Sequence, residues 1–216
     1  MPVVTPRGGS VPPAAHARLL RLGSAGVLLA IGSWHAGHAA WIEVKAQLAQ
    51  LLIRRAWRQE SAGAGDTRPW PWADTHPVAR LLVPSRGVDT FVLAGASGRT
   101  LAFGPGHLDG TSSPGARGNA VISGHRDTHF AFLRRLERGD LVVVEARDGR
   151  LRRFVVASTR IVDRRDLAVV ADVGDTRLTL VTCYPFDALQ PGGPLRYVVV
   201  ALAVDAEHFR ATSAMS

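Results

Sequence analysis

One thiol and two cationic side chains have the residue types and positions for nucleophilic catalysis. Cys183 is the only cysteine among the 216 residues. It closes a run of strand-favouring residues, and Pro185 follows two positions later, so we expect a strand that ends at the thiol. His125 follows a second apolar run, and Arg196 opens a third. A lone cysteine with a histidine and an arginine at strand ends provides the groups of a thiol nucleophile site.

The connection between the two later strands decides whether these groups can meet. It runs from Tyr184 to Pro194 and is rich in proline and glycine. If it lets the strands pair antiparallel, Cys183 and Arg196 lie side by side, because neighbouring strands are only about 4.8 Å apart. Only about 3% of ordinary thiols are ionised at pH 7, so we expect the cations of His125 and Arg196 to favour the thiolate.

These residues carry a resemblance to the sortases, which are membrane-anchored cysteine transpeptidases. The segment Thr179-Leu180-Val181-Thr182-Cys183 is similar to the TLxTC strand of that family. Gly124-His125 after an apolar strand and Arg196 in the last strand complete the resemblance, which covers roughly Pro77 to Asp205. It implies a mostly β fold, an eight-stranded sortase-like β-barrel with one or two short helices.

Two further segments resemble one branch of the family more narrowly. They are Pro69-Trp70-Pro71-Trp72-Ala73-Asp74 and Gly118 to Phe130, and both are similar to the class GN sortases of Gram-negative bacteria. The family resemblance implies a protein substrate that bears a C-terminal sorting signal with a short LPxTG-like motif. The signal would be cut between Thr and Gly and joined to an acceptor amine.

Each of the reactive groups then has an expected role. Cys183 attacks a peptide carbonyl and forms a thioacyl enzyme, while His125 protonates the leaving amine and later takes the proton of the incoming amine. Arg196 bonds the substrate carbonyl or the oxyanion. Thr182, beside the sulfur, is a candidate for binding the substrate backbone, and the alternative is an ordinary β-branched strand residue.

No metal and no cofactor are predicted. Some sortases bind calcium through clustered carboxylates, and the sequence shows no acidic cluster of that kind. A rival interpretation makes His125, Asp127 and His129 metal ligands. Asp127 and His129 have the alternatives of orienting His125 or capping the following helix. His107, in the loop from Phe103 to Gly118, is either a second acid or base or a loop histidine bonded to the backbone.

Two other functions stay open beside the transpeptidase. A lone cysteine is often an inert small hydrophobe, which would leave a catalytically inactive, membrane-tethered peptide-binding barrel. The same reactive groups with water as the acceptor would give a hydrolytic cysteine peptidase. An unpaired thiol in an exported domain favours a reactive role, because an idle thiol is a liability there.

The strongly basic composition raises nucleic acid as a partner class. The net charge is +8 and the pI is near 11.2. Lys45 is the only lysine, and the arginines are scattered without a basic stripe interleaved with aromatic residues. We interpret the charge as solvated surface and expect no nucleic-acid partner, with attraction to anionic lipid as the alternative.

An uncharged segment near the N-terminus predicts a membrane anchor. Leu22 to Ile42 are 21 positions without a charge, about 32 Å as a helix against a hydrocarbon core of about 30 Å. Arg7, Arg18 and Arg21 precede the segment and Trp41 lies at its far edge, which predicts a cytoplasmic N-terminus. The catalytic domain would then lie on the extracytoplasmic, periplasmic side of the inner membrane.

Three alternatives compete with an anchor in this segment. Gly37 and Ala39 have the spacing of a signal-peptide cleavage site, although apolar periodicity continues to Trp57 and favours a retained helix. The polar residues of the segment also fit a buried soluble helix. His35 and His38, one turn apart, are a candidate metal pair.

Composition divides the chain into a series of predicted parts. These are a disordered cytoplasmic tail (residues 1–16), a transmembrane anchor with a helical extension (17–59), a linker (60–76), the catalytic barrel (77–206) and a C-terminal tail (207–216). Short helices are expected near Gly95–Gly98 and Thr128–Arg138. Turn signals between short apolar runs predict the barrel strands, which are Arg80–Val83, Asp89–Leu93, Ala120–Ser123, Leu141–Ala146, Leu151–Val162, Arg177–Cys183 and Arg196–Val204.

Overall fold

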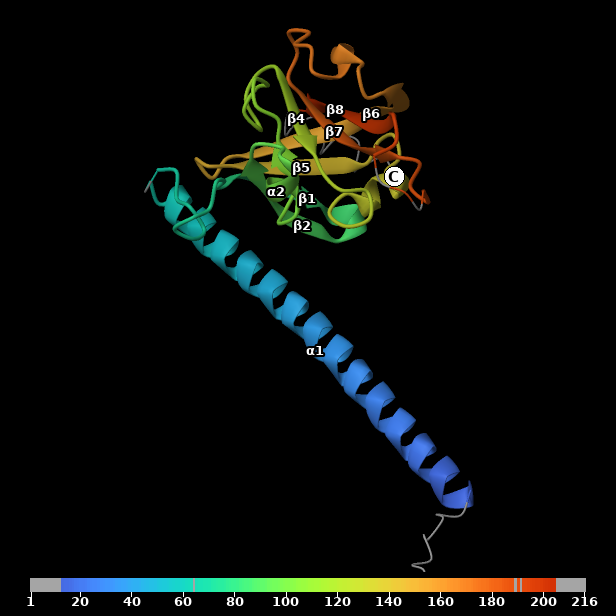
Figure 1. The fold of residues 1–216 in the computed structure, drawn as a ribbon. Coiled ribbons are helices and arrows are strands. Elements are labelled where there is room, and N and C mark those ends of the chain that lie inside the picture. Colours follow the sequence, from blue (N-terminus) through green and yellow to red (C-terminus); the bar gives the residue numbers. More distant parts are fainter. Residues whose placement is uncertain (1–12, 64, 189, 191, 205–216) are drawn as a thin grey trace, which may run out of the picture. The chain divides into compact units, whose positions relative to one another are not determined.

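The computed structural model describes residues 13–63, 65–188, 190 and 192–204, with side chains from Gly26 onward. The chain divides into two compact units, Met1–Leu48 and Ala49–Ser216. Helix α1 (Pro13–Ser61) belongs in part to each of them. The second unit holds the end of α1 and a closed barrel of eight strands (Figure 1). The prediction of a mostly β, eight-stranded barrel is therefore confirmed.

The strands close the barrel in the order β1-β2-β3-β4-β7-β8-β6-β5. Every strand predicted from the sequence is present, and the structure adds β3, whose two residues are too few to show an alternating pattern. The short helices α2 and η2 lie close to the two positions that the sequence predicts. The strands are β1 (Pro77–Val83), β2 (Val88–Ala94), β3 (Gly106–His107), β4 (Asn119–Ser123), β5 (Leu141–Ala146), β6 (Leu151–Asp163), β7 (Arg177–Tyr184) and β8 (Leu195–Val204). The short helices are α2 (Gly98–Leu101) and the 3-10 helices η1 (Pro84–Arg86), η2 (Ala131–Arg135) and η3 (Leu167–Val169).

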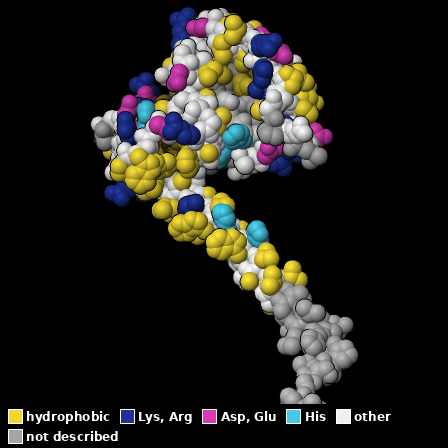
Figure 2. Space-filling model, viewed as in Figure 1, with side chains coloured by type: hydrophobic (Ala, Val, Ile, Leu, Met, Phe, Trp, Pro, Cys, Tyr) yellow, Lys and Arg dark blue, Asp and Glu magenta, His cyan; other side chains and the backbone are white. Residues whose placement is uncertain are grey.

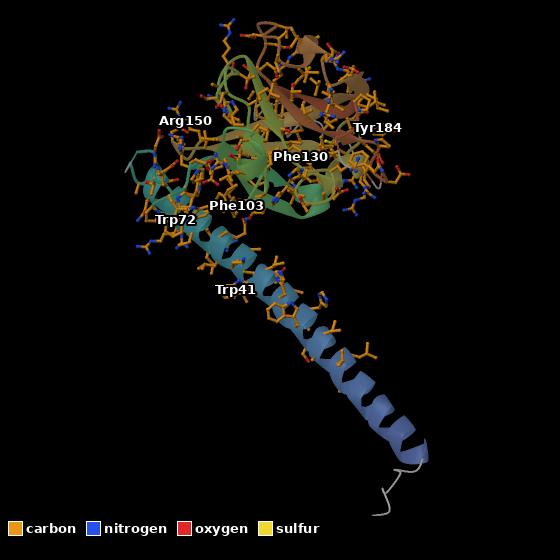
Figure 3. All side chains as sticks on the ribbon, viewed as in Figure 1. Trp41, Trp72, Phe103, Phe130, Arg150 and Tyr184 are labelled. Atoms are coloured by element: carbon orange, nitrogen blue, oxygen red, sulfur yellow. The ribbon has the colours of Figure 1, made fainter. Side chains whose placement is uncertain are left out.

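Side chains alternate between the two faces of each strand, and the apolar side chains of the inner faces fill the interior of the barrel. Leu178 and Leu180 of β7 are fully buried together with Ile122 of β4 and Val199 of β8. Phe130, from the segment after β4, is buried in the same core (Figure 3). Burial of each of these side chains stabilises the fold by about 1.5–3 kcal/mol. The opposite faces of β4, β7 and β8 are therefore directed away from the core.

The last part of α1 packs on the barrel within the second unit. Ile53 and Trp57, one turn apart on the helix, are buried in a cluster with Phe91 of β2. Gln50 adds a hydrogen bond of 2.6 Å from its side-chain nitrogen to the carbonyl oxygen of Phe103. The predicted helical extension is therefore part of the packing of the second unit.

The segment predicted as a linker, residues 60–76, departs from that prediction at its start. Helix α1 continues to Ser61. Trp70 packs edge-on against Phe103 with ring centroids 5.0 Å apart, whereas Trp72 is 82% exposed. Helix α1 begins at Pro13, so positions 13–16 of the predicted tail are helical. The rest of that tail and the tail over residues 207–216 lie outside the described residues.

In the first unit, the side chains described from Gly26 to Leu48 are all exposed, and many of them are apolar (Figure 2). The predicted membrane-spanning segment from Leu22 to Ile42 lies within α1. However, no helix in the described part of the chain is long and apolar enough to cross a membrane. The transmembrane element of the fold prediction is therefore not confirmed.

Candidate active site

Three neighbouring strands bring the predicted reactive residues to one edge of the sheet. Strand β7 lies between β4 and β8 in the barrel (Figure 1). Strands β7 and β8 are antiparallel, and Cys183 is directly opposite Arg196 in their register. The pairing predicted from the Pro/Gly-rich connection is therefore confirmed. Cross-strand partners have Cβ atoms about 4.5–5.5 Å apart, so the thiol and the base of the arginine side chain are neighbours.

His125 reaches the same edge through a parallel pair of strands. Ser123 of β4 is opposite Val181 of β7, and the pairing extends one step further through a 3.1 Å hydrogen bond from the Gly124 nitrogen to the Val181 carbonyl. His125 lies two positions beyond Ser123, and Cys183 lies two positions beyond Val181. His125 therefore emerges beside the end of β7, where Cys183 is still paired with β8. The His125 side chain is exposed, and its carbonyl accepts a 2.9 Å hydrogen bond from the Phe130 nitrogen.

Gly124 is required by the packing immediately before His125. A Cβ atom at this position would lie 2.7 Å from the ring of Phe130, closer than real Cβ contacts. Phe130 is itself fully buried (Figure 3) and cannot move away without disturbing the core. The glycine therefore lets the chain turn over the aromatic ring and fixes where the histidine emerges.

Thr182 lies beside Cys183 on β7, as the sequence analysis expects, and its side chain faces the core. It is only 1% exposed, and its hydroxyl donates a 2.7 Å hydrogen bond to the Gly124 carbonyl. Strand alternation places it on the same side of β7 as the buried Leu178 and Leu180, whereas Cys183 is on the other side. This hydroxyl links β7 to the His125 turn, and the role of Thr182 in binding the substrate backbone stays a prediction.

Arg196 is half-buried at the start of β8. Its Nη1 donates hydrogen bonds of 2.8 Å to the carbonyl oxygens of Gly193 and Leu195. The guanidinium is thus held by the chain just before the strand. The side chain of Arg196 thus starts beside Cys183, and its guanidinium is a cation at the same edge that can donate to an oxygen that develops negative charge.

Comparison with known protein families shows which family has this arrangement of Cys183, His125 and Arg196. The family model of the Sortase domain matches residues 81–204, which are more than half of the chain. The chain belongs to the sortase family. Sortases are cysteine transpeptidases, and the match includes Cys183, His125 and Arg196.

Individual relatives agree with this assignment. Sortase D of Bacillus subtilis (strain 168) is 31% identical over 120 residues, which are 55% of this chain and 60% of that protein. The matches span about half to three-fifths of the length of the curated relatives. The solved structure of sortase C-1 from Actinomyces oris is similar with a TM-score of 0.54 and 31% identity, covering 61% of this chain and 76% of that one. A Clostridium perfringens sortase D5 structure, at a TM-score of 0.61 and 19% identity over 74% of this chain and 99% of that one, shows likeness of fold alone.

The connection between β6 and β7 covers part of the outer face of this sortase barrel. Asn119 of β4, which is 3% exposed, donates from its side-chain nitrogen to the carbonyl oxygens of Val169 (2.9 Å) and Ala171 (3.0 Å). Its side-chain oxygen accepts a 2.7 Å bond from the hydroxyl of Thr179 on β7. One buried asparagine therefore holds this connection against the two strands that lead to His125 and Cys183.

An aromatic group closes the barrel beneath the reactive edge. Tyr184, Phe186 and Tyr197 have ring centroids 5.1–6.3 Å apart. Phe186 and Tyr197 also pack against the main core. The guanidinium of Arg134 lies 5.3 Å from the centre of the Phe186 ring. Because Tyr184 directly follows Cys183, these contacts give the end of β7 a firm support.

Arg126 is a residue of the site that the sequence analysis missed. Its side chain is 4% exposed, although the arginines as a group are interpreted from sequence as solvated surface. Its guanidinium donates to backbone carbonyl oxygens of the connection between β7 and β8. Position directly after His125 is the one signal in the sequence that points to it.

Within the described residues, the ligand atoms of the His-x-Asp-x-His segment are not grouped at metal-ligand spacing. Arg126 donates to the Asp127 carboxylate at 3.3 Å, and Asp127 is 68% exposed. The pKa of His129 is lowered, first by burial and then by the positive charge of His125. His107, the other candidate acid or base, bonds through Nε2 to the Ser112 carbonyl oxygen at 2.9 Å.

Among the described residues, the one group with metal-ligand spacing is Glu60, Asp66 and His76. Arg147 already occupies it, since its guanidinium is bonded to Asp66 and donates to Nε2 of His76 at 2.6 Å. Its Nε also lies 3.4 Å from a buried carboxylate oxygen of Glu60. Burial raises the pKa of Glu60 to about 7, and Arg147 opposes that shift. The group is therefore an ion-paired network around a guanidinium.

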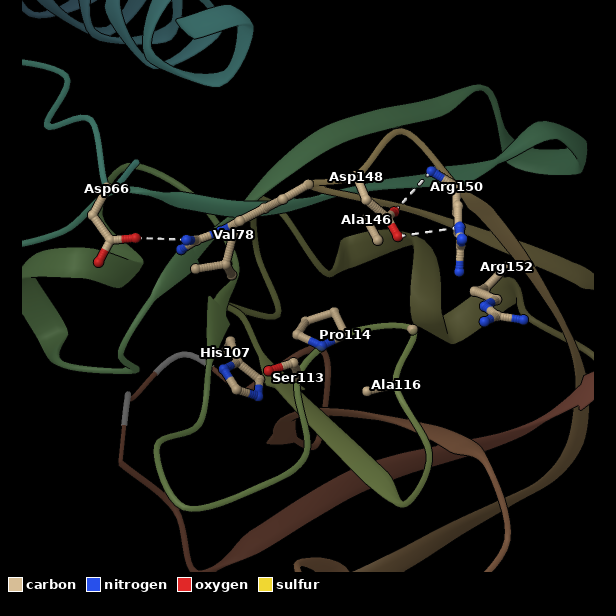
Figure 4. A pocket seen from close by; sticks show the side chains of 12 residues that line it. Asp66, Val78, His107, Ser113, Pro114, Ala116, Ala146, Asp148, Arg150 and Arg152 are labelled. Carbon is tan, nitrogen blue, oxygen red and sulfur yellow. Dashed lines mark hydrogen bonds and ion pairs between the residues drawn. The ribbon is translucent and has the colours of Figure 1, made fainter. Parts of the chain in front are cut away.

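A cavity of about 530 Å³ lies at the other end of the barrel (Figure 4). It is lined by the β5–β6 hairpin and by the loop that follows His107, and three arginines of the hairpin contribute to it. Arg150 and Tyr184 mark the two opposite sides of the barrel in Figure 3. Cys183, His125 and Arg196 do not line this cavity, so it is separate from the reactive edge.

Proposed function

We propose that this sortase cleaves a C-terminal sorting signal of a partner protein through a thioacyl intermediate and transfers the acyl group to an amine. The observation that carries the proposal is the register pair of Cys183 and Arg196, with His125 leaving the neighbouring strand at the same edge. The resemblance to sortases supports an LPxTG-like motif as the recognised sequence.

In the first half-reaction, the sulfur of Cys183 attacks the carbonyl carbon of the scissile peptide bond. The carbonyl oxygen becomes an oxyanion that accepts hydrogen bonds from Arg196. The carbon–nitrogen bond then breaks, and the imidazolium of His125 gives its proton to the leaving amine. The products are a thioester on Cys183 and a released peptide with a free amino group.

In the second half-reaction, an amine attacks the thioester carbonyl and His125 takes a proton from it. The carbon–sulfur bond breaks and returns the thiolate. Arg196 is suited to both halves, because only its Nη1 is bonded to the chain. Within the described residues its Nε and Nη2 hydrogens have no protein acceptor and are available to the substrate.

Hydrolysis is a second outcome that the geometry favours. The His125 side chain is exposed and Cys183 is half-buried, so water can reach a thioester formed there. Amine and water then compete for the same intermediate. The acceptor present in the experiment distinguishes the transpeptidase from a hydrolytic cysteine peptidase.

The test uses a fluorogenic peptide that contains an LPxTG-like motif, with and without an added amine. The wild type should cleave it, form a thioacyl adduct visible by mass spectrometry and pass the acyl group to the amine. Cys183→Ala should retain the fold and lose all three signals, and Arg196→Ala should lower kcat about 100- to 1000-fold. Arg177→Ala, on the same strand as Cys183 but at its other end, is the matched control and should keep wild-type kcat. Full turnover by Cys183→Ala would reject the proposal, and peptide binding without cleavage by the wild type would favour the inactive barrel.

We also propose that the segment from Leu22 to Ile42 anchors the chain in the inner membrane, with the barrel on the periplasmic side. Its lack of charge, the arginines before it and the similarity to the class GN sortases support this placement. The full chain, expressed in a Gram-negative host, should resist alkaline carbonate extraction. Cys183 should react with a membrane-impermeant thiol reagent added outside the inner membrane. Release of the full chain by carbonate would contradict the anchor.

A further inference from the structure

We propose that Arg126 is a positioning residue that sets the geometry of the whole reactive edge by holding the connection between Cys183 and Arg196. The inference rests on the proposed function, since it assigns a residue to the same site. Arg126 touches none of the reacting atoms, so its effect is exerted through His125 on one side and the β7–β8 connection on the other.

The contacts of Arg126 all converge on that connection. Its Nη1 donates to the Pro185 carbonyl oxygen at 2.8 Å. Its Nη2 donates to the carbonyl oxygens of Ala188 at 2.6 Å and Gln190 at 3.2 Å. Three carbonyls of one short segment are therefore gathered around a single guanidinium.

Burial makes these bonds decisive for the local structure. The side chain is 4% exposed, and its one anionic neighbour, Asp127, is 68% exposed and reached only by Nε at 3.3 Å. A buried cation is costly unless its hydrogens are bonded, and a planar guanidinium directs several donors at fixed angles. A lysine carries the same charge but cannot reach three carbonyls with that geometry.

Backbone hydrogen bonds hold the β7–β8 connection at few points, and Phe186 in its first half packs against the core. Pro185 and Pro194 have no backbone N–H group, and no strand ladder continues past Tyr184. Among the described residues of this connection, the backbone bonds are those from Ala188 to Pro185 at 3.4 Å and from Arg164 to Pro194 at 2.7 Å. Besides the packing of Phe186, side-chain donors therefore fix the path between the nucleophile and Arg196.

Two arginines hold the connection, one in each half. Arg126 binds the carbonyls of its first half, while Nη1 of Arg196 binds those of Gly193 and Leu195 in its second half. The second half of the connection is therefore held by the same guanidinium whose Nε and Nη2 are available to the substrate oxygen. Arg126 keeps the first half of the connection folded independently of Arg196, so the path from Cys183 is kept when Arg196 binds the substrate oxygen.

The hydrogen bonds from Arg126 to the β7–β8 connection form a clamp, and His125 is coupled to this clamp because it is the preceding residue in the chain. Arg126 is the next residue, so the position of its buried side chain determines where the His125 turn lies. The Gly124 carbonyl, one residue earlier, is held by Thr182. The imidazole is thus fixed from both sides against the strand and the connection that carry the other two groups.

The test compares Arg126→Lys with Arg80→Lys in the full chain, using the fluorogenic peptide. Arg80 also makes three side-chain hydrogen bonds, to Asp89 and Glu145, but on β1, away from the site, so Arg80→Lys should keep the wild-type kcat. At a temperature where circular dichroism shows every variant folded, Arg126→Lys should lower kcat about 10- to 100-fold with KM changed less than kcat. Millimolar methylguanidine should restore part of the kcat of Arg126→Ala. A folded Arg126→Lys variant with wild-type kcat would overturn the inference.

A second readout separates the failure of this inference from failure of the proposed function. If the wild type cleaves no peptide, the proposed function fails, and the clamp is then judged by backbone hydrogen exchange alone. Exchange of the Ala188 amide should be at least about tenfold faster in Arg126→Lys than in Arg80→Lys. Equal exchange in the two variants would overturn the clamp, even where the wild type is an active transpeptidase.

Discussion

Two contacts on a single glycine decide where the general acid of the proposed reaction lies. The ring of Phe130 approaches the Cα of Gly124 from one side, and the hydroxyl of Thr182 binds its carbonyl. His125 follows directly and is exposed. The position of the imidazole is therefore set by residues that contact no substrate, which is the usual arrangement for a preorganised site.

Gly124→Ala should consequently damage both stability and catalysis. The added methyl group must displace the Phe130 ring or the backbone, which costs about 1–3 kcal/mol. The same shift moves His125, so kcat should fall about tenfold or more. Urea unfolding and peptide turnover measure the two effects. Gly98→Ala, where nothing lies within 4 Å of the new Cβ, is the control and should change neither quantity appreciably. Equal stability of the two variants would show that the Phe130 contact is unimportant.

At the scale of elements, the end of α1 is joined to the β5–β6 hairpin by charged groups. Glu60 has a side chain that is 1% exposed, and it meets Arg147 of the hairpin at 3.4 Å. The Thr67 nitrogen donates to its other oxygen at 3.0 Å. One oxygen of Glu60 has no hydrogen-bond donor within the described residues. The helix end is therefore held by a carboxyl group that is costly to ionise.

The stability of this junction should depend on pH. Burial raises the pKa of Glu60 from 4.5 to about 7, so folding favours the protonated form. Its stabilising contribution is full below about pH 4.5 and is lost as the pH rises through about 7. Glu60→Gln removes this dependence, so the free energy of unfolding of the variant relative to wild type should increase by about 3 kcal/mol between pH 4.5 and 8.

Urea titrations over that pH range measure this difference. The pKa of Asp66 is lowered, chiefly by its hydrogen bond to Arg147, and that of His76 is lowered, chiefly by burial. Both groups are present in the wild type and the variant, so their contributions largely cancel. Glu43→Gln, at an exposed position of the same helix, is the matched control. A difference that stays constant with pH would show that Glu60 is ionised at little cost.

The whole chain consists of two units whose boundary lies inside α1, after Leu48. Residues 49–61 supply Ile53 and Trp57 to the cluster with Phe91, so this part of the helix is needed to cover the barrel. The catalytic barrel predicted over residues 77–206 is thus only part of the folded unit. The helix that leads away from the barrel is part of its packing as well as its connection to the first unit.

Two truncations should separate these roles. A chain of residues 49–216 should melt within a few degrees of the full chain, because it keeps the buried end of α1. A chain of residues 62–216 loses the burial of Ile53 and Trp57, about 3–5 kcal/mol, and should melt about 10 °C lower. Thermal unfolding followed by circular dichroism checks both. The same melting temperature for the two truncations would mean that the helix end does not stabilise the barrel.

Local patterns in the sequence were sufficient for seven of the eight strands and for the register of the reactive pair. Alternating apolar residues mark β7 and β8, and the Pro/Gly-rich connection between them favours an antiparallel pair with Cys183 opposite Arg196. These features depend on residues close together in the chain, and a strand's period and its turns are local properties. The family motif around Cys183 belongs to the same stretch.

Only the tertiary structure decided which distant segments support that pair. Strand β4 lies beside β7 although more than 50 residues separate them, and this neighbourhood turns Thr182 inward onto Gly124 and buries Arg126 against the β7–β8 connection. No local pattern distinguishes a buried arginine from the many exposed ones, because its burial depends on carbonyls about 60 residues further along the chain. The sequence by itself thus determined the reactive groups and their strands, whereas long-range packing determined how firmly they are held.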